Sequence, residues 1–473
     1  MRTPPLASGP EGPRALRPLL DTVLEALRDG AQERGGPLPA GGPETVAAQV
    51  RDALGDVLPD EGDPEALRHL VRSLAEGSAD PADPLCAAHL HCPPLAVAAA
   101  ADLAASVLNP SLDSWDQAPA ASELERLVTR VLANEVYTDV PRGAGNCPTS
   151  HNGAAADNAP DALVTTGGTE SNQLALLLAR ETLGAGTRLV CGANAHHSLP
   201  RSAWLLGLPD PVTVPAPAGT LDPAALDAAL TDLPGPHLVA ATAGTTDAGL
   251  IDPLPEIAAV CRTHGARLHI DAAYGGGLLF STRHRNKLTG LSAAATVTLD
   301  LHKLGWQPVA AGLLAVQDDR DLAALRQRAD YLNADDDTEA GLPDLLGRSL
   351  RTTRRPDALK IAVTLKTLGR TGLGRLVDQV CARATEFAAL VQSHPGFELH
   401  DPPTISTVLF RPVHATDDDI AAVRRKLLTD GRAVLGRARL DGRLWLKATL
   451  LNPHTRPDDL AALLKVVEGT TRR

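Results

Sequence analysis

The sequence predicts an α/β protein whose core is a mainly parallel β-sheet. From about residue 160, short apolar runs alternate with amphipathic segments, as where DALVTTGG precedes SNQLALLLARETLG. The runs are apolar throughout, which is typical of strands that helices cover on both faces. The chain has 473 residues, enough for a large domain of this class with smaller appendages.

Three regions follow one another along the chain. Residues 1–95 carry helical patterns such as LRPLLDTVLEALRDG between Gly- and Pro-rich breaks, and we expect an N-terminal helical arm there. Residues 96–355 contain the alternating runs and predict the large domain. Residues 356–473 combine helical segments with alternating strands such as ISTVLFRP, and predict a small C-terminal α+β domain.

Composition argues against several classes of function. A net charge of -12 disfavours binding to a phosphate backbone, so nucleic acid is not an expected partner. No apolar run is long enough to cross a bilayer, and the N-terminal segment lacks the apolar stretch of a secretory signal, so we expect a cytoplasmic protein. The six cysteines include no C-x-x-C pair, which argues against disulfides and structural zinc.

The loops that follow the predicted strands concentrate glycine and polar residues. In parallel sheets the ligand binds beyond the carboxyl ends of the strands, so these loops are where a site is expected. They read TTGGTESN, ANAHHS, TAGTTDAG, HIDAAYGG and DLHKLGWQP. The first is neither G-x-G-x-x-G nor a Walker A loop, so it gives no support to a dinucleotide or a nucleoside triphosphate.

These loops resemble those of pyridoxal 5'-phosphate (PLP) enzymes of fold type I, the aspartate-aminotransferase fold, and specifically the group II amino-acid decarboxylases. The resemblance runs from about Cys86 to about Leu464. Motifs such as HLHCPP, NPSLDSWDQAPAASELE and LKATLLNPHT are most similar to the members that act on 2,4-diaminobutyrate or, for siderophores, on lysine. The resemblance implies PLP as the cofactor and conversion of a diamino acid (2,4-diaminobutyrate, lysine or ornithine) to its amine and CO2.

Lys303, in DLHKLGWQP, is the expected covalent anchor of the cofactor. An amine in a partly desolvated pocket has a lowered pKa and can attack the cofactor aldehyde to form a Schiff base. A lysine at a strand end is by itself usually a surface charge. The neighbouring His302 and the other four loops favour the reactive role.

Asp271, at the end of ARLHID, is the expected partner of the pyridine nitrogen, because PLP enzymes need a carboxylate there. A plain helix cap is the structural alternative. Small residues after it, including Ala273, allow a flat ring to approach closely. By resemblance, Thr246 bonds either the Asp271 carboxylate or the ring hydroxyl.

The GGT segment, with Gly168 and Thr169, is the expected cradle of the cofactor phosphate, because N–H groups at a helix N-terminus bind anions. Thr169 as an ordinary N-cap is the alternative. By resemblance, His302 contacts the phosphate or the substrate. An acid near a phosphate is unfavourable unless it is protonated or turned away, so the role of Asp300 stays open.

His196 resembles the histidine that stacks on the cofactor ring and helps to orient the substrate carboxylate, with His197 as the competing assignment. A metal site is the alternative for these histidines. It would need His89, His91 and Cys92 to converge on them from a separate segment, and we expect no metal.

Three further residues are candidates for contact with the substrate. Tyr331, in ADYLNADDD, resembles the loop tyrosine that protonates the substrate carbon after CO2 leaves, and a partly buried structural tyrosine is the alternative. Lys447 occupies the place of a carboxylate-binding arginine, or is a satisfied charge of the small domain. Trp306 lines the substrate pocket or supports its turn. The acids after Tyr331 attract a distal ammonium, or are merely solvated.

Other functions remain open on the same fold. Decarboxylation of an aliphatic or aromatic amino acid, transamination, and a non-enzymatic binding module are the alternatives to a diamino-acid decarboxylase. Active sites of this fold are commonly completed by two subunits, so the resemblance implies a homodimer in which the N-terminal helices cross to the partner.

Overall fold

The computed structural model describes residues 4–138, 159–327, 329 and 331–471. Two compact units make up the chain: a large unit, Pro94–Gln379, and a small unit in which Met1–Pro93 joins Val380–Arg473. The N-terminal and C-terminal segments thus share one unit. The division into domains 1–95, 96–355 and 356–473 stays a prediction.

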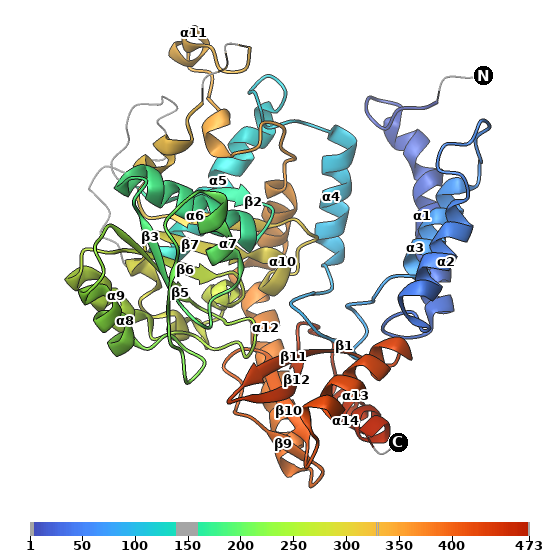
Figure 1. The fold of residues 1–473 in the computed structure, drawn as a ribbon. Coiled ribbons are helices and arrows are strands. Elements are labelled where there is room, and N and C mark those ends of the chain that lie inside the picture. Colours follow the sequence, from blue (N-terminus) through green and yellow to red (C-terminus); the bar gives the residue numbers. More distant parts are fainter. Residues whose placement is uncertain (1–3, 139–158, 328, 330, 472–473) are drawn as a thin grey trace. The chain divides into compact units, whose positions relative to one another are not determined.

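The large unit contains a seven-stranded sheet in the order β2-β8-β7-β6-β5-β3-β4. Figure 1 labels β2, β3, β5, β6 and β7 of this sheet. Neighbouring strands are parallel from β4 through β7, whereas β8 runs antiparallel to both β7 and β2. The expected mainly parallel sheet is therefore confirmed. The strands are β2 (Asp161–Thr165), β3 (Arg188–Gly192), β4 (Val212–Val214), β5 (His237–Thr242), β6 (Arg267–Ala272), β7 (Thr296–Asp300) and β8 (Gly312–Val316).

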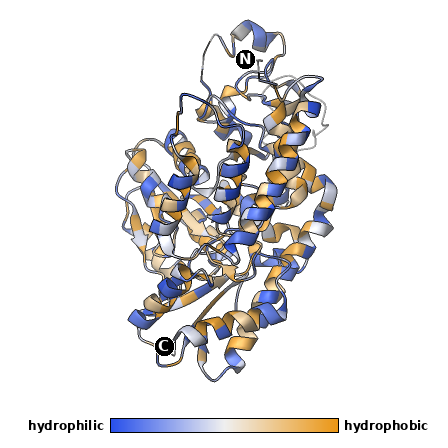
Figure 2. Cartoon of the chain, turned by 90° about the vertical axis from the view of Figure 1, so that its right-hand side faces the viewer, coloured by the Kyte–Doolittle hydropathy of each residue, from blue (hydrophilic) through white to orange (hydrophobic). Residues whose placement is uncertain are grey.

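Single helices in Figure 2 show both hydrophobic and hydrophilic residues along their length. The helices of the large unit are α4 (Ala96–Leu108), α5 (Pro119–Val136), α6 (Gly168–Leu183), α7 (Ser198–Leu205), α8 (Pro223–Thr231), α9 (Leu254–Thr263), α10 (Leu301–Leu304) and α11 (Asp335–Glu339), with 3-10 turns at Gly275–Phe280, Arg285–Leu288, Leu291–Ala293, Asp319–Leu325 and Leu346–Arg348. α12 (Ala358–Ser393) includes the boundary between the units and is interrupted at Gly369, whose φ is 60°.

Helix α6 is buried on two sides, and this fixes the position of its first turn. On one side Leu174 and Leu178 pack against Leu163 and Leu314 of the sheet. On the other side Leu176 packs in a cluster with residues of β3, β5 and α7. Because α6 begins at Gly168, the packing of its body sets where the GGT segment lies.

The small unit has a five-stranded sheet in the order β1-β11-β12-β10-β9. Its core includes Phe387, Phe397 and Phe410, with Phe387 and Phe410 in edge contact at 5.2 Å between ring centroids. Its elements are α1 (Gly12–Arg34), α2 (Gly42–Leu54), α3 (Ala66–Glu76), β1 (Cys86–Ala87), β9 (Phe397–Leu399), β10 (Thr407–Pro412), α13 (Asp417–Thr429), β11 (Val434–Leu440), β12 (Arg443–Thr449) and α14 (Pro457–Thr471).

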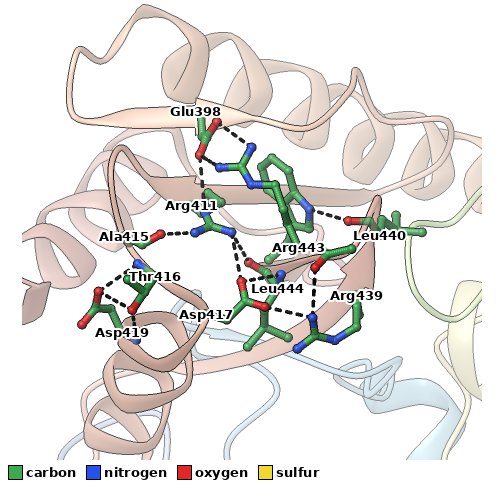
Figure 3. A network of polar contacts seen from close by, with 12 residues as sticks. Glu398, Arg411, Ala415, Thr416, Asp417, Asp419, Arg439, Leu440, Arg443 and Leu444 are labelled. Atoms are coloured by element: carbon green, nitrogen blue, oxygen red, sulfur yellow. Dashed lines mark hydrogen bonds and ion pairs between the residues drawn. The ribbon is translucent and has the colours of Figure 1, made fainter.

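Polar contacts around Arg411 tie α13 to this sheet (Figure 3). The buried Arg411 guanidinium donates to the carbonyls of Leu444, at 3.0 Å, and Ala415. At the start of α13, Asp417 accepts from the Leu444 N–H at 2.9 Å, and Thr416 forms a capping box with Asp419. The side chains of this network therefore bind backbone groups and the N-terminal cap of α13.

Among the described residues, no helix combines the length and apolar character that crossing a bilayer requires. The described cysteines, at positions 86, 92, 191, 261 and 381, are not joined in disulfide bonds. Burial raises the pKa of Cys86 and of Cys261 to about 12, so both thiols stay protonated at neutral pH. Cys147 lies outside the described residues.

Candidate active site

Lys303 lies in the short helix α10, which follows directly on β7. Its Nζ is 2.9 Å from Oδ2 of Asp300, whose side chain is 2% exposed. The Lys303 side chain is 19% exposed, so it is not an ordinary solvated charge. The other carboxylate oxygen, Asp300 Oδ1, accepts no hydrogen bond from the described residues. A buried carboxylate therefore holds the amine at the carboxyl edge of the sheet and keeps one acceptor position open.

Asp271 ends β6 and is buried. Its Oδ1 accepts from the N–H of Ala273 at 3.0 Å, and its Oδ2 accepts from Nδ2 of Asn172 at 2.8 Å. Both bonds come from neutral donors, so the carboxylate is held in a fixed place without an ion pair that would neutralise it.

The GGT segment lies so close to Ala273, Asp300 and His302 that a side chain at Gly167 or Gly168 would force these neighbours to shift. A Cβ on Gly168 would lie 3.0 Å from Cβ of Ala273 and 3.2 Å from Oδ2 of Asp300. A Cβ on Gly167, where φ is 154°, would lie 3.0 Å from the His302 ring. The N-cap of α6 is Gly167 and not Thr169, which is exposed in the first turn, so the capping alternative for Thr169 is wrong.

Two histidines reach this edge. His302 places Nε2 3.5 Å from Oδ2 of Asp300, and burial lowers its pKa. His196 bonds Ser198 Oγ through Nδ1 at 2.8 Å; burial lowers its pKa, although the charge of Asp271 opposes that shift. The neighbouring His197 is exposed, so the geometry favours His196 for the ring-stacking role.

The candidates Lys303, His302, Asp271, Ala273, Gly168 and His196 thus come together, and they bring residues that sequence reasoning missed. Asn172 bonds both Asp271 and Ser198, and its carbonyl contacts His269 and Thr298. A signal for them existed: His269 and Thr298 are polar residues inside strands that are almost entirely buried.

Two candidates lie at the solvent. Tyr331 is 84% exposed, which contradicts the alternative of a buried structural tyrosine. Thr246 is also exposed, whereas its neighbour Thr245 is buried and accepts from the N–H of Leu250 at 3.0 Å. The side chains of Asp336, Asp337 and Glu339 are exposed, and that of Asp335 lies outside the described side chains.

Trp306 and Lys447 are both buried. Trp306 is completely buried, and its carbonyl accepts from the N–H of Leu95 at 2.9 Å, which favours support of the turn over contact with the substrate. Lys447 belongs to β12 of the small unit. There its charge helps to lower the pKa of His89, after burial, which is the larger cause. Its role in substrate binding stays a prediction.

Within the described ranges, no group of three or more His, Cys, Asp and Glu side chains is arranged to hold a metal ion. The histidines of ANAHHS belong to the large unit, whereas His89, His91 and Cys92 belong to the small unit.

Known proteins share this arrangement of elements. The model of the pyridoxal-dependent decarboxylase conserved domain matches residues 52–413. The L-2,4-diaminobutyrate decarboxylase of Rhizobium meliloti (strain 1021) is 40% identical over 436 residues, 88% of this chain and 84% of that protein. The L-2,4-diaminobutyrate decarboxylase of Acinetobacter baumannii is 31% identical, over 86% of this chain and 84% of that protein.

Solved structures of other proteins have a similar fold. The glutamate decarboxylase domain of a diaminobutyrate-pyruvate transaminase and L-2,4-diaminobutyrate decarboxylase from Vibrio parahaemolyticus superposes with a TM-score of 0.82 at 30% identity, covering 99% of this chain and 97% of that chain. The Oryza sativa TDC solved with PLP and tryptamine superposes with a TM-score of 0.86 at 22% identity, covering 98% and 99%, a likeness of fold. The chain therefore belongs to the pyridoxal-dependent decarboxylase family, carboxy-lyases of fold type I that use PLP to decarboxylate amino acids.

Proposed function

We propose that this enzyme decarboxylates L-2,4-diaminobutyrate, or a close diamino acid such as ornithine or lysine, to the corresponding amine and CO2. The observation that carries the proposal is the 40% identity, over 88% of the chain, to a relative named L-2,4-diaminobutyrate decarboxylase. A second relative of that name, at 31% identity, supports it.

The residues present fit PLP. A glycine backbone packed tightly against its neighbours, a buried carboxylate and a mostly buried amine meet at one edge of the sheet. Lys303 would hold the cofactor through its amine, Asp271 would bind the pyridine nitrogen, and Gly168, Thr169 and His302 would hold the phosphate. Ala273 would leave room for the ring, and Thr246 would bind beside it. When bound, PLP withdraws electrons from the substrate Cα, so that the carboxylate can leave as CO2.

Chain residues then supply orientation and a proton. His196 would cover one ring face and orient the substrate carboxylate, which its neutral, half-buried imidazole suits. Tyr331 would donate its hydroxyl proton to Cα after CO2 leaves, which its exposed position on a polar segment allows on closure. Tyr331→Phe is expected to lower kcat by about 100-fold while PLP affinity is kept.

Substrate choice is tested with purified, PLP-loaded enzyme and carboxyl-labelled amino acids. We expect the highest kcat/KM with 2,4-diaminobutyrate, with labelled CO2 and 1,3-diaminopropane appearing in equal amounts. Formation of a keto acid without CO2 would show transamination instead. A higher kcat/KM with glutamate, aspartate or an aromatic amino acid would refute the diamino-acid assignment.

We also propose a homodimer in which the N-terminal helices contact the partner. The apolar side chains that α1–α3 leave exposed support this proposal, because exposed leucines in such number are unusual on a monomer. They include Leu19, Leu24, Leu27, Leu54, Leu70 and Leu74. Light scattering should give twice the chain mass, and Leu24→Glu with Leu74→Glu should give monomers. A fully active wild-type monomer would refute the dimer. A cytoplasmic location remains a prediction.

A further inference from the structure

Behind Asp271 lies a cluster of polar side chains that are all completely buried. Asn172 comes from α6, His269 from β6, Thr298 from β7 and Ser198 from the start of α7. Buried polar groups are costly unless they are hydrogen-bonded, so four of them at one point need an explanation.

The amide of Asn172 is the centre of this cluster. Its Nδ2 donates to Asp271 Oδ2 at 2.8 Å and to Ser198 Oγ at 2.9 Å. Its Oδ1 accepts from Thr298 Oγ1 at 2.9 Å and pairs with His269 Nε2 at 3.0 Å. Because a carboxylate only accepts hydrogen bonds, the NH2 group must face Asp271, and the orientation of the amide is therefore fixed.

The position of each proton follows from that orientation. Since Asn172 Oδ1 only accepts, His269 must carry its proton on Nε2, and its Nδ1 accepts from Thr296 Oγ1 at 2.9 Å. Burial lowers the pKa of His269, although Asp271 opposes this, so the ring is neutral at neutral pH, as that pattern requires.

The same reasoning about donors and acceptors applies to His196, which is linked to Asn172 through Ser198. Ser198 Oγ accepts from Asn172 and lies 2.8 Å from His196 Nδ1. The Ser198 N–H is directed at the same nitrogen, at 3.3 Å. His196 Nδ1 is therefore an acceptor, and the neutral ring carries its proton on Nε2.

We propose that Asn172 is a positioning residue for two groups of the cofactor site. It holds the Asp271 carboxylate for the pyridine nitrogen. Through Ser198, it also fixes His196 as the Nε2–H tautomer. The inference rests on the proposed PLP site. It assigns to one amide the orientation of both groups, so loss of that amide disturbs them together, whereas loss of the Ser198 hydroxyl disturbs His196 alone.

The first test needs neither cofactor nor substrate. Two-bond 15N–1H NMR of apoprotein labelled with 15N-histidine reports the tautomer of each ring, and His196→Phe identifies the His196 signal. We expect His196 in the Nε2–H form in the wild type and a mixture of tautomers in Ser198→Ala and Asn172→Leu. A wild-type His196 in the Nδ1–H form would overturn the proposal, whatever the variants do.

The second test follows the Asp271 branch. Asn172→Leu keeps the number and branching of the side-chain heavy atoms but removes both N–H donors, and leaves a buried carboxylate with one donor fewer. We expect its Kd for PLP, from absorbance titration, to rise about 5-fold to 100-fold, and 15N-labelled PLP to lose part of its ring-nitrogen protonation signal. Ser198→Ala should change the PLP Kd less than 3-fold, roughly within the range for a bond that does not touch Asp271.

A matched control separates this role from general destabilisation. Asn194 donates to the buried Asp252 at 2.8 Å, the same kind of bond in the same unit, outside the Asn172 cluster. Asn194→Leu should lower the melting temperature without changing the ring-nitrogen signal. If Asn172→Leu folds and matches Asn194→Leu in PLP Kd and ring-nitrogen signal, the coupling is refuted; if Asn172→Leu does not fold, the Ser198→Ala tautomer decides. A wild type that shows the expected tautomer but does not decarboxylate 2,4-diaminobutyrate refutes the substrate assignment only.

Discussion

Two polar networks in this protein are built on opposite plans. Around Arg411 in the small unit, ionised side chains such as Glu398 and Asp417 pair with arginines and with backbone groups, and part of the network faces solvent (Figure 3). At the edge of the large sheet, two neutral donors bind Asp271, and one oxygen of Asp300 has no hydrogen-bond partner in the part of the chain that the structure describes. The network around Arg411 holds elements together, whereas the network around Asp271 and Asp300 leaves charge available for a ligand.

The largest effect should come from a substitution of Lys303, at the edge of the large sheet. Lys303→Ala is expected to lower kcat/KM at least about 1,000-fold, because the amine that holds the cofactor is removed. The visible absorption and its bleaching by borohydride should also disappear. Lys360→Met is the control: Lys360 is also paired with a carboxylate, 3.0 Å from Asp357, and is completely buried, so its loss should reduce stability and keep the absorption. Borohydride-reducible absorption in Lys303→Ala would refute the assignment.

A substitution in the network around Arg411 should instead lower the free energy of unfolding. Arg411→Met leaves Glu398 and Asp417 without their shared cation and two carbonyls without a donor. We expect a loss of about 3 kcal/mol in the free energy of unfolding, measured with guanidinium, with the PLP Kd unchanged. If PLP binding weakened more than stability, the separation between the two networks would be wrong.

The neutral state of His269 should be visible as a dependence of stability on pH. Its folded-state pKa is lowered by burial, so below about pH 6.5 the unfolded chain binds a proton that the folded chain excludes. Stability therefore falls as the pH falls, with a slope of up to about 1.4 kcal/mol per pH unit from this group. His269→Gln should reduce the slope between pH 6.5 and 5 by up to that amount, and an unchanged slope would contradict a neutral His269.

The smallest effect should come from Thr416, at the edge of the network around Arg411. Thr416 caps α13 through its side chain and forms a capping box with Asp419. Thr416→Ala should lower the free energy of unfolding by about 1 kcal/mol, and Thr416→Ser should restore most of it, because the serine hydroxyl accepts the same bond. Equal losses in the two variants would argue against the capping box.

The sequence predicted the parts of the site that local pattern determines. Apolar runs without alternation gave the parallel sheet, and loops rich in glycine gave its carboxyl edge with Lys303 and Asp271. Asn172 was missed because its partners His269, Asp271 and Thr298 lie 97 to 126 residues away along the chain. Nor does local pattern show that the N-terminal segment joins the small unit, which depends on the pairing of the two-residue β1 with β11.

The burial of Trp306 gives the enzyme an optical probe of its own. The chain has four tryptophans; Trp306 is completely buried and stands three residues from Lys303, whereas Trp115 and Trp204 of the same unit are exposed. Emission from a fully buried indole is shifted to short wavelengths, and a chromophore bound at Lys303 would accept its excitation energy. Because Trp445 is buried as well, loss of the blue edge of the fluorescence in a Trp445→Phe variant should report loading of the site in real time, without a label.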